Sequence, residues 1–94
     1  MGVLGVLTLE LVLHDAHSLK EKRQTVRALK DRLRKRFNVS VAEVDRQDSW
    51  QHGVVAVAAV ASDRTQLESI LARAEDEAAE ILGGALADSR VELL

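Results

Sequence analysis

Two segments of the sequence each carry a single apolar stripe at helical spacing, and this feature limits the possible folds most. They are residues 18–37 and the segment that runs from residues 62–65 to the Gly83-Gly84 pair. Side chains three and four residues apart share one face of a helix, so each helix can bury only one face. The stripes are formed by Leu19, Val26, Leu29, Leu33 and Phe37 in the first segment, and by Leu67, Ile70, Leu71, Ala74, Ala78, Ile81 and Leu82 in the second.

Capping residues mark the ends of both predicted helices. Ser18 and Glu21 match the capping box, in which the serine accepts a hydrogen bond from the third helical N–H and the glutamate reaches back to the cap. Asn38 is expected to end the first helix in a left-handed conformation. The second helix has three alternative caps, which are Ser62, Asp63 and Thr65.

Residues 3–13 and 54–61 are apolar on both sides when they are read with the two-residue period of a β-strand. Apolarity on both sides is typical of a central strand, which is covered on both faces. Residues 39–44 form a more polar strand, so we expect it at an edge of the sheet. Residues 85–93 form the last predicted strand.

The predicted order is therefore β-α-β-β-α-β in one domain, residues 1–94. Two helices with one apolar stripe each can cover only one face of a four-stranded sheet. This predicts an α+β ferredoxin-like sandwich, with the two central segments in the middle of an antiparallel sheet and both helices on one face. The other face exposes aliphatic side chains, which predicts a homodimer through the open sheet face. A lysine at Val57 or Ala59, whichever faces away from the helices, is then expected to give a monomer.

Composition excludes several classes of function. The chain has no cysteine, which excludes disulfides, thiolate metal sites and a cysteine nucleophile. Phe37 and Trp50 are the only aromatic residues, so the sheet lacks the stacking residues of an RNA-recognition motif. No apolar run is long enough for a membrane span, and residues 3–13 have no basic flank like that of an export signal. We therefore expect a cytoplasmic protein.

The first predicted helix is strongly basic, although the chain as a whole has a formal net charge of −2. Residues 18–37 hold nine lysines and arginines against two acids, a formal charge of +7. Five of these cations, spaced three and four residues apart, form a basic ridge about 21 Å long beside the apolar stripe. The basic ridge consists of Lys20, Arg23, Arg27, Lys30 and Arg34. Together with Lys22, these are the candidate residues for binding RNA phosphates or other anions.

In an alternative interpretation, this positive charge is neutralised within the protein and has no ligand. The second helix is acidic, and the two helices are neighbours in a ferredoxin-like sandwich, so part of the basic ridge could face acids. Lys22 and Arg32 also lie close enough to the apolar stripe for their aliphatic stems to cover it. The acids in question are Glu68, Glu75, Asp76, Glu77 and Glu80. The direction in which the basic ridge faces decides between the two interpretations.

Three smaller polar clusters have both a structural and a functional interpretation. Free N–H groups beside Ser18 could hold a phosphate, but Glu21 competes for the same groups. The segment His14-Asp15-Ala16-His17 lacks a fourth ligand at a recognisable spacing, which argues against a metal site. Asp48 and Trp50, in the turn before the third strand, form a candidate contact surface or are ordinary turn residues.

No catalytic constellation is present in the sequence. An acylphosphatase-like site requires a glycine-rich anion loop with an arginine after the first strand, where this chain has His-Asp-Ala-His-Ser. A copper-chaperone-like site requires a cysteine pair in the same place. We therefore predict a protein that is not an enzyme and has no catalytic residues, no cofactor and no metal.

Several segments resemble the YlxP-like family of small bacterial proteins. The resemblance covers nearly the whole chain up to the second helix. From about Gln66 the individual residues no longer match, and only the sequence pattern is similar. It implies a ferredoxin-like fold and a biochemical role that is not established. Genes of the family often lie beside those for translation initiation and ribosome maturation, which suggests a connection with the ribosome or RNA. The resembling segments are HSLKEKR at residues 17–23, KRFNVSVAEVD at residues 35–45, Gln47-Asp48 and Trp50-Gln51, and they include Lys20, Lys22, Arg23, Asp48 and Trp50.

Two hypotheses about function follow. In the first, a non-enzymatic protein contacts ribosomal or other structured RNA through the basic ridge, mainly at phosphates. In the second, the protein is a homodimeric interaction module that dimerises through its open sheet face. Its basic helix then binds an acidic protein partner or is only a charged, solvated face of the fold.

Overall fold

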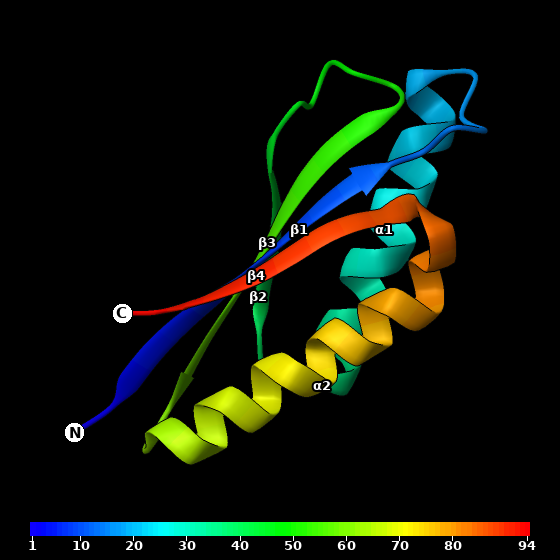
Figure 1. Ribbon diagram of the computed structural model, residues 1–94. Helices are drawn as coiled ribbons and strands as arrows, with labels where there is room; N and C mark the ends of the chain where they lie inside the picture. The colour runs from blue at the N-terminus through cyan, green and yellow to red at the C-terminus, as the bar shows by residue number, and fades with distance from the viewer.

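The two segments that are apolar on both sides form the centre of an antiparallel sheet. The computed structural model describes residues 1–94, and Figure 1 shows a single four-stranded sheet with both helices on one face. The order of the strands across the sheet is β2-β3-β1-β4. The elements are β1 (Val3–Val12), α1 (Leu19–Arg36), β2 (Ser40–Asp45), β3 (His52–Ala61), α2 (Arg64–Leu82), a 3₁₀ turn (Gly83–Ala85) and β4 (Leu86–Leu93). This arrangement confirms the predicted ferredoxin-like sandwich.

The central strands pair along their whole length. In the β1–β3 pair, Val3 lies opposite Ala61 and Val12 lies opposite His52. β4 pairs with the other side of β1, and β2 with the other side of β3. The more polar strand β2 is therefore at an edge, as its composition predicts.

The core lies between the sheet and the two helices. Leu7 and Leu9 of β1 and Val55 of β3 are fully buried, and they meet the apolar stripes of α1 and α2. Because side chains alternate along a strand, every second residue of the central strands points into this core. The helical stripes contribute Val26, Leu29, Leu33, Leu67, Leu71, Ala74, Ala78 and Leu82.

The opposite face of the sheet is not covered by any other element. Leu4, Val44 and Val60 are 43%, 53% and 61% exposed. The residues named above for a monomer-forming lysine were wrong, because Val57 and Ala59 are only 0% and 3% exposed and both face the helices. Alternation along β3 places the intervening residues on the open face instead, and these are Val54, Ala56, Ala58 and Val60.

The helix ends agree with the predicted caps at three of four positions. The Ser18 hydroxyl accepts a hydrogen bond from the Glu21 N–H, and the second helix uses Asp63 as its cap. α2 ends at Leu82, directly before the two glycines. The prediction for Asn38 was wrong, since Arg46 (φ 61°) is the only residue other than glycine with a positive φ. Neither helix is long and apolar enough to cross a membrane.

Candidate nucleic-acid interface

The basic ridge lies on the side of α1 that borders the edge strand β2. The Arg34 guanidinium donates a hydrogen bond to the carbonyl oxygen of Val41 in β2, with an N···O distance of 2.7 Å. Further along the ridge, a shallow hollow of about 160 Å³ lies beside β2, and Arg23, Arg27 and Lys30 are among its lining residues. The ridge therefore faces away from the acidic helix α2.

The acidic helix pairs with other cations of α1. Arg32 and Arg36 donate to the two carboxylate oxygens of Glu77, at 2.9 and 3.1 Å. Glu77 is largely buried, so this cluster fastens the C-terminal half of α1 to the C-terminal half of α2. Arg73 of α2 lies over the Phe37 ring, 5.6 Å from its centroid. Neutralisation of the α1 charge by the acidic helix α2 thus holds for Arg32 and Arg36 but not for the basic ridge.

Four ridge residues have no partner within the protein. Lys20, Arg23 and Arg27 are exposed and Lys30 is half-buried, and none of the four forms an ion pair or a side-chain hydrogen bond. Unpaired cations keep their full charge available to a ligand, and a row of them on one helix face presents positive charge along about 15 Å.

Lys22 does not belong to this surface. Its side chain is 0% exposed, so it cannot contact RNA, and this removes it from the predicted set of binding residues. The Nζ atom lies 2.6 Å from Oε2 of Glu43 in β2 and donates to the carbonyl oxygen of Arg46 at 2.6 Å. Lys22 therefore fastens α1 to β2 and to the first residue of the β2–β3 loop.

A glycine leaves the room that this buried ion pair needs. A Cβ atom on Gly53 would lie 3.3 Å from Cε of Lys22 and 3.4 Å from Oε2 of Glu43. The contact with Lys22 is tighter than an ordinary van der Waals contact, and the contact with Glu43 lies at its lower limit. The absence of a side chain at the start of β3 thus permits Lys22 and Glu43 to meet beneath the ridge.

The Lys22–Glu43 pair also affects the charge of the ridge. Glu43 lines the same shallow hollow as Arg23 and Arg27. A carboxylate in that place would attract the nearby arginines and cancel part of their charge. Because Lys22 holds and neutralises Glu43 from the inner side, the ridge arginines stay unpaired.

The structure does not join Asp48 and Trp50 to the basic ridge by any hydrogen bond or ion pair. Both lie in the loop between β2 and β3, and Trp50 is 50% exposed. Within the loop, the Ser49 N–H donates to the Arg46 carbonyl, and the Ser49 hydroxyl accepts from the His52 N–H. These contacts are those of an ordered turn that presents an exposed indole.

The first turn of α1 is occupied by its own cap. Oε2 of Glu21 accepts a hydrogen bond from the His17 N–H at 2.6 Å, while the Ser18 hydroxyl accepts from the Glu21 N–H at 3.2 Å. A carboxylate at this turn repels a phosphate. The structure therefore favours the capping interpretation of the turn and leaves the middle of α1 as the anion-binding candidate.

Fold and surface together define a small ferredoxin-like protein with one basic helix face beside an edge strand. Residues 4–91 match the family described as "Protein of unknown function (DUF503)". The uncharacterized protein YlxP of Bacillus subtilis (strain 168) is 41% identical over 71 residues, which are 76% of this chain and 77% of YlxP. The chain belongs to the DUF503 family, and the resemblance to the YlxP-like family is confirmed.

Solved structures with the same fold are much less similar in sequence. A dimeric ferredoxin-like protein of unknown function from Thermobifida fusca has a TM-score of 0.53 at 11% identity, covering 97% of this chain and 90% of that one. SnoaB, a cofactor-independent oxygenase from Streptomyces nogalater, has a TM-score of 0.57 at 15% identity over 97% and 90% of the two chains. At such identities the likeness shows the fold alone.

Proposed function

We propose that this protein is a non-enzymatic, cytoplasmic RNA-binding protein that contacts the phosphates of ribosomal or other structured RNA through the basic ridge. The observation that carries the proposal is the row of unpaired cations Lys20, Arg23, Arg27 and Lys30, on the side of α1 that faces away from the acidic helix. Phosphate contacts with lysine and arginine supply most of the affinity in non-specific binding of nucleic acids.

The internal ion pairs support this assignment because they separate structural cations from free ones. Arg32 and Arg36 form ion pairs with Glu77, and Lys22 forms an ion pair with Glu43. The cations that remain without an acid lie mainly on the ridge. At physiological salt the screening length is about 8 Å, so a phosphate that approaches the ridge interacts with several of them at once.

The ridge is suited to reading the RNA backbone and not its bases. Recognition of single-stranded bases depends on aromatic stacking, and the ridge contains no aromatic residue. Phe37, at the end of α1, is half-buried and packs against the core. We therefore expect binding to structured RNA with little dependence on sequence.

Fluorescence anisotropy with a labelled hairpin from 16S ribosomal RNA tests the proposal. The wild-type protein is compared with the triple variant Arg23→Ala, Arg27→Ala, Lys30→Ala between about 50 and 200 mM salt. Each lost phosphate contact lowers the slope of log affinity against log salt by about one, so the triple variant should lose up to about three.

A second triple variant controls for net charge. Arg64→Ala, Arg73→Ala, Arg90→Ala removes the same charge from α2 and β4, which lie outside the ridge. It should keep more of the affinity and salt slope than the ridge variant. Equal losses in both triple variants, or wild-type binding without salt dependence, would contradict the proposal.

A second candidate function is homodimerisation through the open sheet face, as an interaction module without a role in RNA binding. It is favoured by the exposed aliphatic side chains of Leu4, Val44 and Val60 on that face. From strand rise and spacing, the face measures about 500 Å² and a pair of faces about 1,000 Å². The whole face reaches the lower limit for a specific interface. A second copy matches its apolar part on β1, β2 and β3, and Asp88, Arg90 and Glu92 of β4 form a charged edge.

Analytical ultracentrifugation tests the dimer. Ala58→Lys and Val60→Lys place a charge on the open face, whereas Ala72→Lys places one on an exposed position of α2. A wild-type dimer that becomes monomeric in the first two variants and not in the third would support the candidate. A wild-type monomer at high protein concentration, or a dimer in all variants, would eliminate it.

A further inference from the structure

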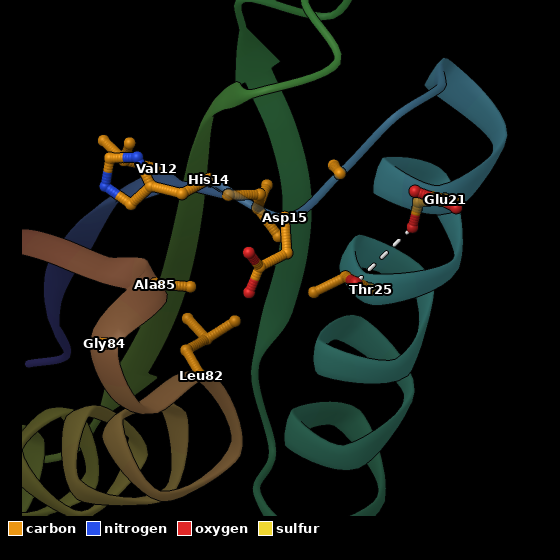
Figure 2. Close-up of a pocket in the computed structure, with 10 residues that line it drawn as sticks. Val12, His14, Asp15, Glu21, Thr25, Leu82, Gly84 and Ala85 are labelled. Carbon is orange, nitrogen blue, oxygen red and sulfur yellow. Dashed lines mark hydrogen bonds between the residues drawn. The ribbon is translucent and has the colours of Figure 1, made fainter.

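The largest hollow of the molecule lies at one end of the sheet, where β1 leads into α1 and where α2 leads into β4 (Figure 2). Its volume is about 490 Å³, which is within the range of small-molecule pockets. At 100° per residue, its α1 residues Glu21 and Thr25 lie on the side of the helix opposite the basic ridge. We call this hollow the terminal cleft.

The terminal cleft exists because the two helices do not stay side by side. They are fastened near the C-terminal half of α1, where Arg32 and Arg36 meet Glu77. Toward the start of α1 and the end of α2 the helices separate (Figure 1), and the segment from Val12 to Ala16 lines the hollow between them (Figure 2). The cleft thus results from the helix crossing.

The lining combines apolar walls with oxygen acceptors. Leu82 and Ala85 form one wall, and Figure 2 shows the Asp15 carboxylate directed into the space between this wall and Thr25. Asp15 forms no hydrogen bond or ion pair in the structure. The remaining polar groups of the lining are His14, whose ring points away in Figure 2, and Glu21, which serves the helix cap.

The charge of the cleft selects the kind of ligand. Asp15 and Glu21 line it, and no lysine or arginine does. Gly84 lies just beyond the C-terminal end of α2, where the helix dipole is negative. At the positive N-terminal end of α1, Glu21 and Ser18 already occupy the helix cap. An anion is therefore repelled. A metal ion lacks ligands, because no group of three or more His, Asp or Glu side chains converges in this protein.

We propose that the terminal cleft binds a small organic cation that has a primary ammonium group on a short aliphatic chain. The ammonium group binds the Asp15 carboxylate and donates to the Thr25 hydroxyl oxygen, and the aliphatic chain packs against Leu82 and Ala85. Because the Asp15 carboxylate is exposed, its ion pair is screened by water, and burial of the aliphatic chain against Leu82 and Ala85 supplies the rest of the affinity. This site is separate from the basic ridge and does not depend on RNA binding.

Titration with n-butylammonium chloride, followed by two-dimensional ¹H–¹⁵N NMR at constant ionic strength, tests the proposal. The backbone amides of Asp15, Thr25 and Gly84 should shift and saturate, and sodium butyrate should leave them unchanged. Asp15→Asn removes the charge without breaking a structural contact and should weaken binding by up to about fivefold. Asp76→Asn, a matched change at an exposed position of α2, should bind as the wild type does.

Three outcomes would overturn the proposal. The first is an absence of saturating shifts at these amides up to high millimolar n-butylammonium. The second is an equal response to butyrate, which would show that only the aliphatic chain is bound. The third is equal weakening by Asp15→Asn and Asp76→Asn, which would show a general effect of net charge.

Discussion

The ammonium group of Lys22 lies 2.6 Å from the carboxylate of Glu43, and the lysine side chain is completely shielded from solvent. This ion pair joins two of the sequence segments that resemble the YlxP-like family, one at the start of α1 and the other in β2. Lys22 also fixes the β2–β3 loop through the Arg46 carbonyl and neutralises Glu43, which lines the same hollow as the ridge arginines.

Replacement of Lys22 by methionine should destabilise the protein by about 3 kcal/mol, because the Glu43 carboxylate loses its partner while it remains mostly buried. The double variant Lys22→Met, Glu43→Gln removes both charges and should recover most of this loss. Urea denaturation of both variants measures the difference. Equal stability of the two would show that the unpaired carboxylate is not the cause.

The same pair of variants makes a prediction about RNA. In Lys22→Met, the Glu43 carboxylate is no longer neutralised, and its negative charge in the hollow lined by Arg23 and Arg27 opposes a phosphate, so RNA affinity and salt slope should fall. Adding Glu43→Gln removes the competing acid and should restore both. If the wild type binds RNA but the double variant does not recover the lost affinity, Lys22 has no part in keeping the ridge free. The RNA proposal would still stand.

Glu77→Gln should cost about 1 kcal/mol of stability. The carboxylate is largely buried, but Arg32 and Arg36 are 48% and 58% exposed, so their ion pairs are partly screened by water. High salt should reduce the difference from the wild type in thermal unfolding. RNA affinity should change little, because the two arginines lie outside the basic ridge. A large gain in RNA affinity would show that Arg32 and Arg36, once released from Glu77, belong to the binding surface.

Gly53→Ala should destabilise the protein by about 1–2 kcal/mol, because the new methyl group crowds Lys22 and Glu43. Gly84→Ala is a matched control. No atom lies within 4 Å of a Cβ at Gly84, and its φ is not positive, so alanine should be neutral or slightly stabilising. Urea denaturation of both variants checks the contrast, and equal effects would show that crowding at the ion pair is unimportant.

The sequence by itself determined the architecture. The apolar stripes of the helices, the two-sided central strands and the Ser18 cap are local patterns, and each is set by the periodicity of its own element. The order of the elements then leaves few ways to cover one face of a sheet, so the ferredoxin-like sandwich could be predicted in full. The error at Asn38 concerned one backbone conformation at a helix end, where local preferences are weak.

Only the tertiary structure decided which cations are free. Lys22 and Arg23 are adjacent in sequence and equally basic, yet 100° of helix rotation places one under β2 and the other in solvent. The partners that neutralise Lys22, Arg32 and Arg36 are 21, 45 and 41 residues away in sequence. Charge is cancelled through space and not along the chain, so the basic ridge and the terminal cleft became visible only when the helices were placed on the sheet.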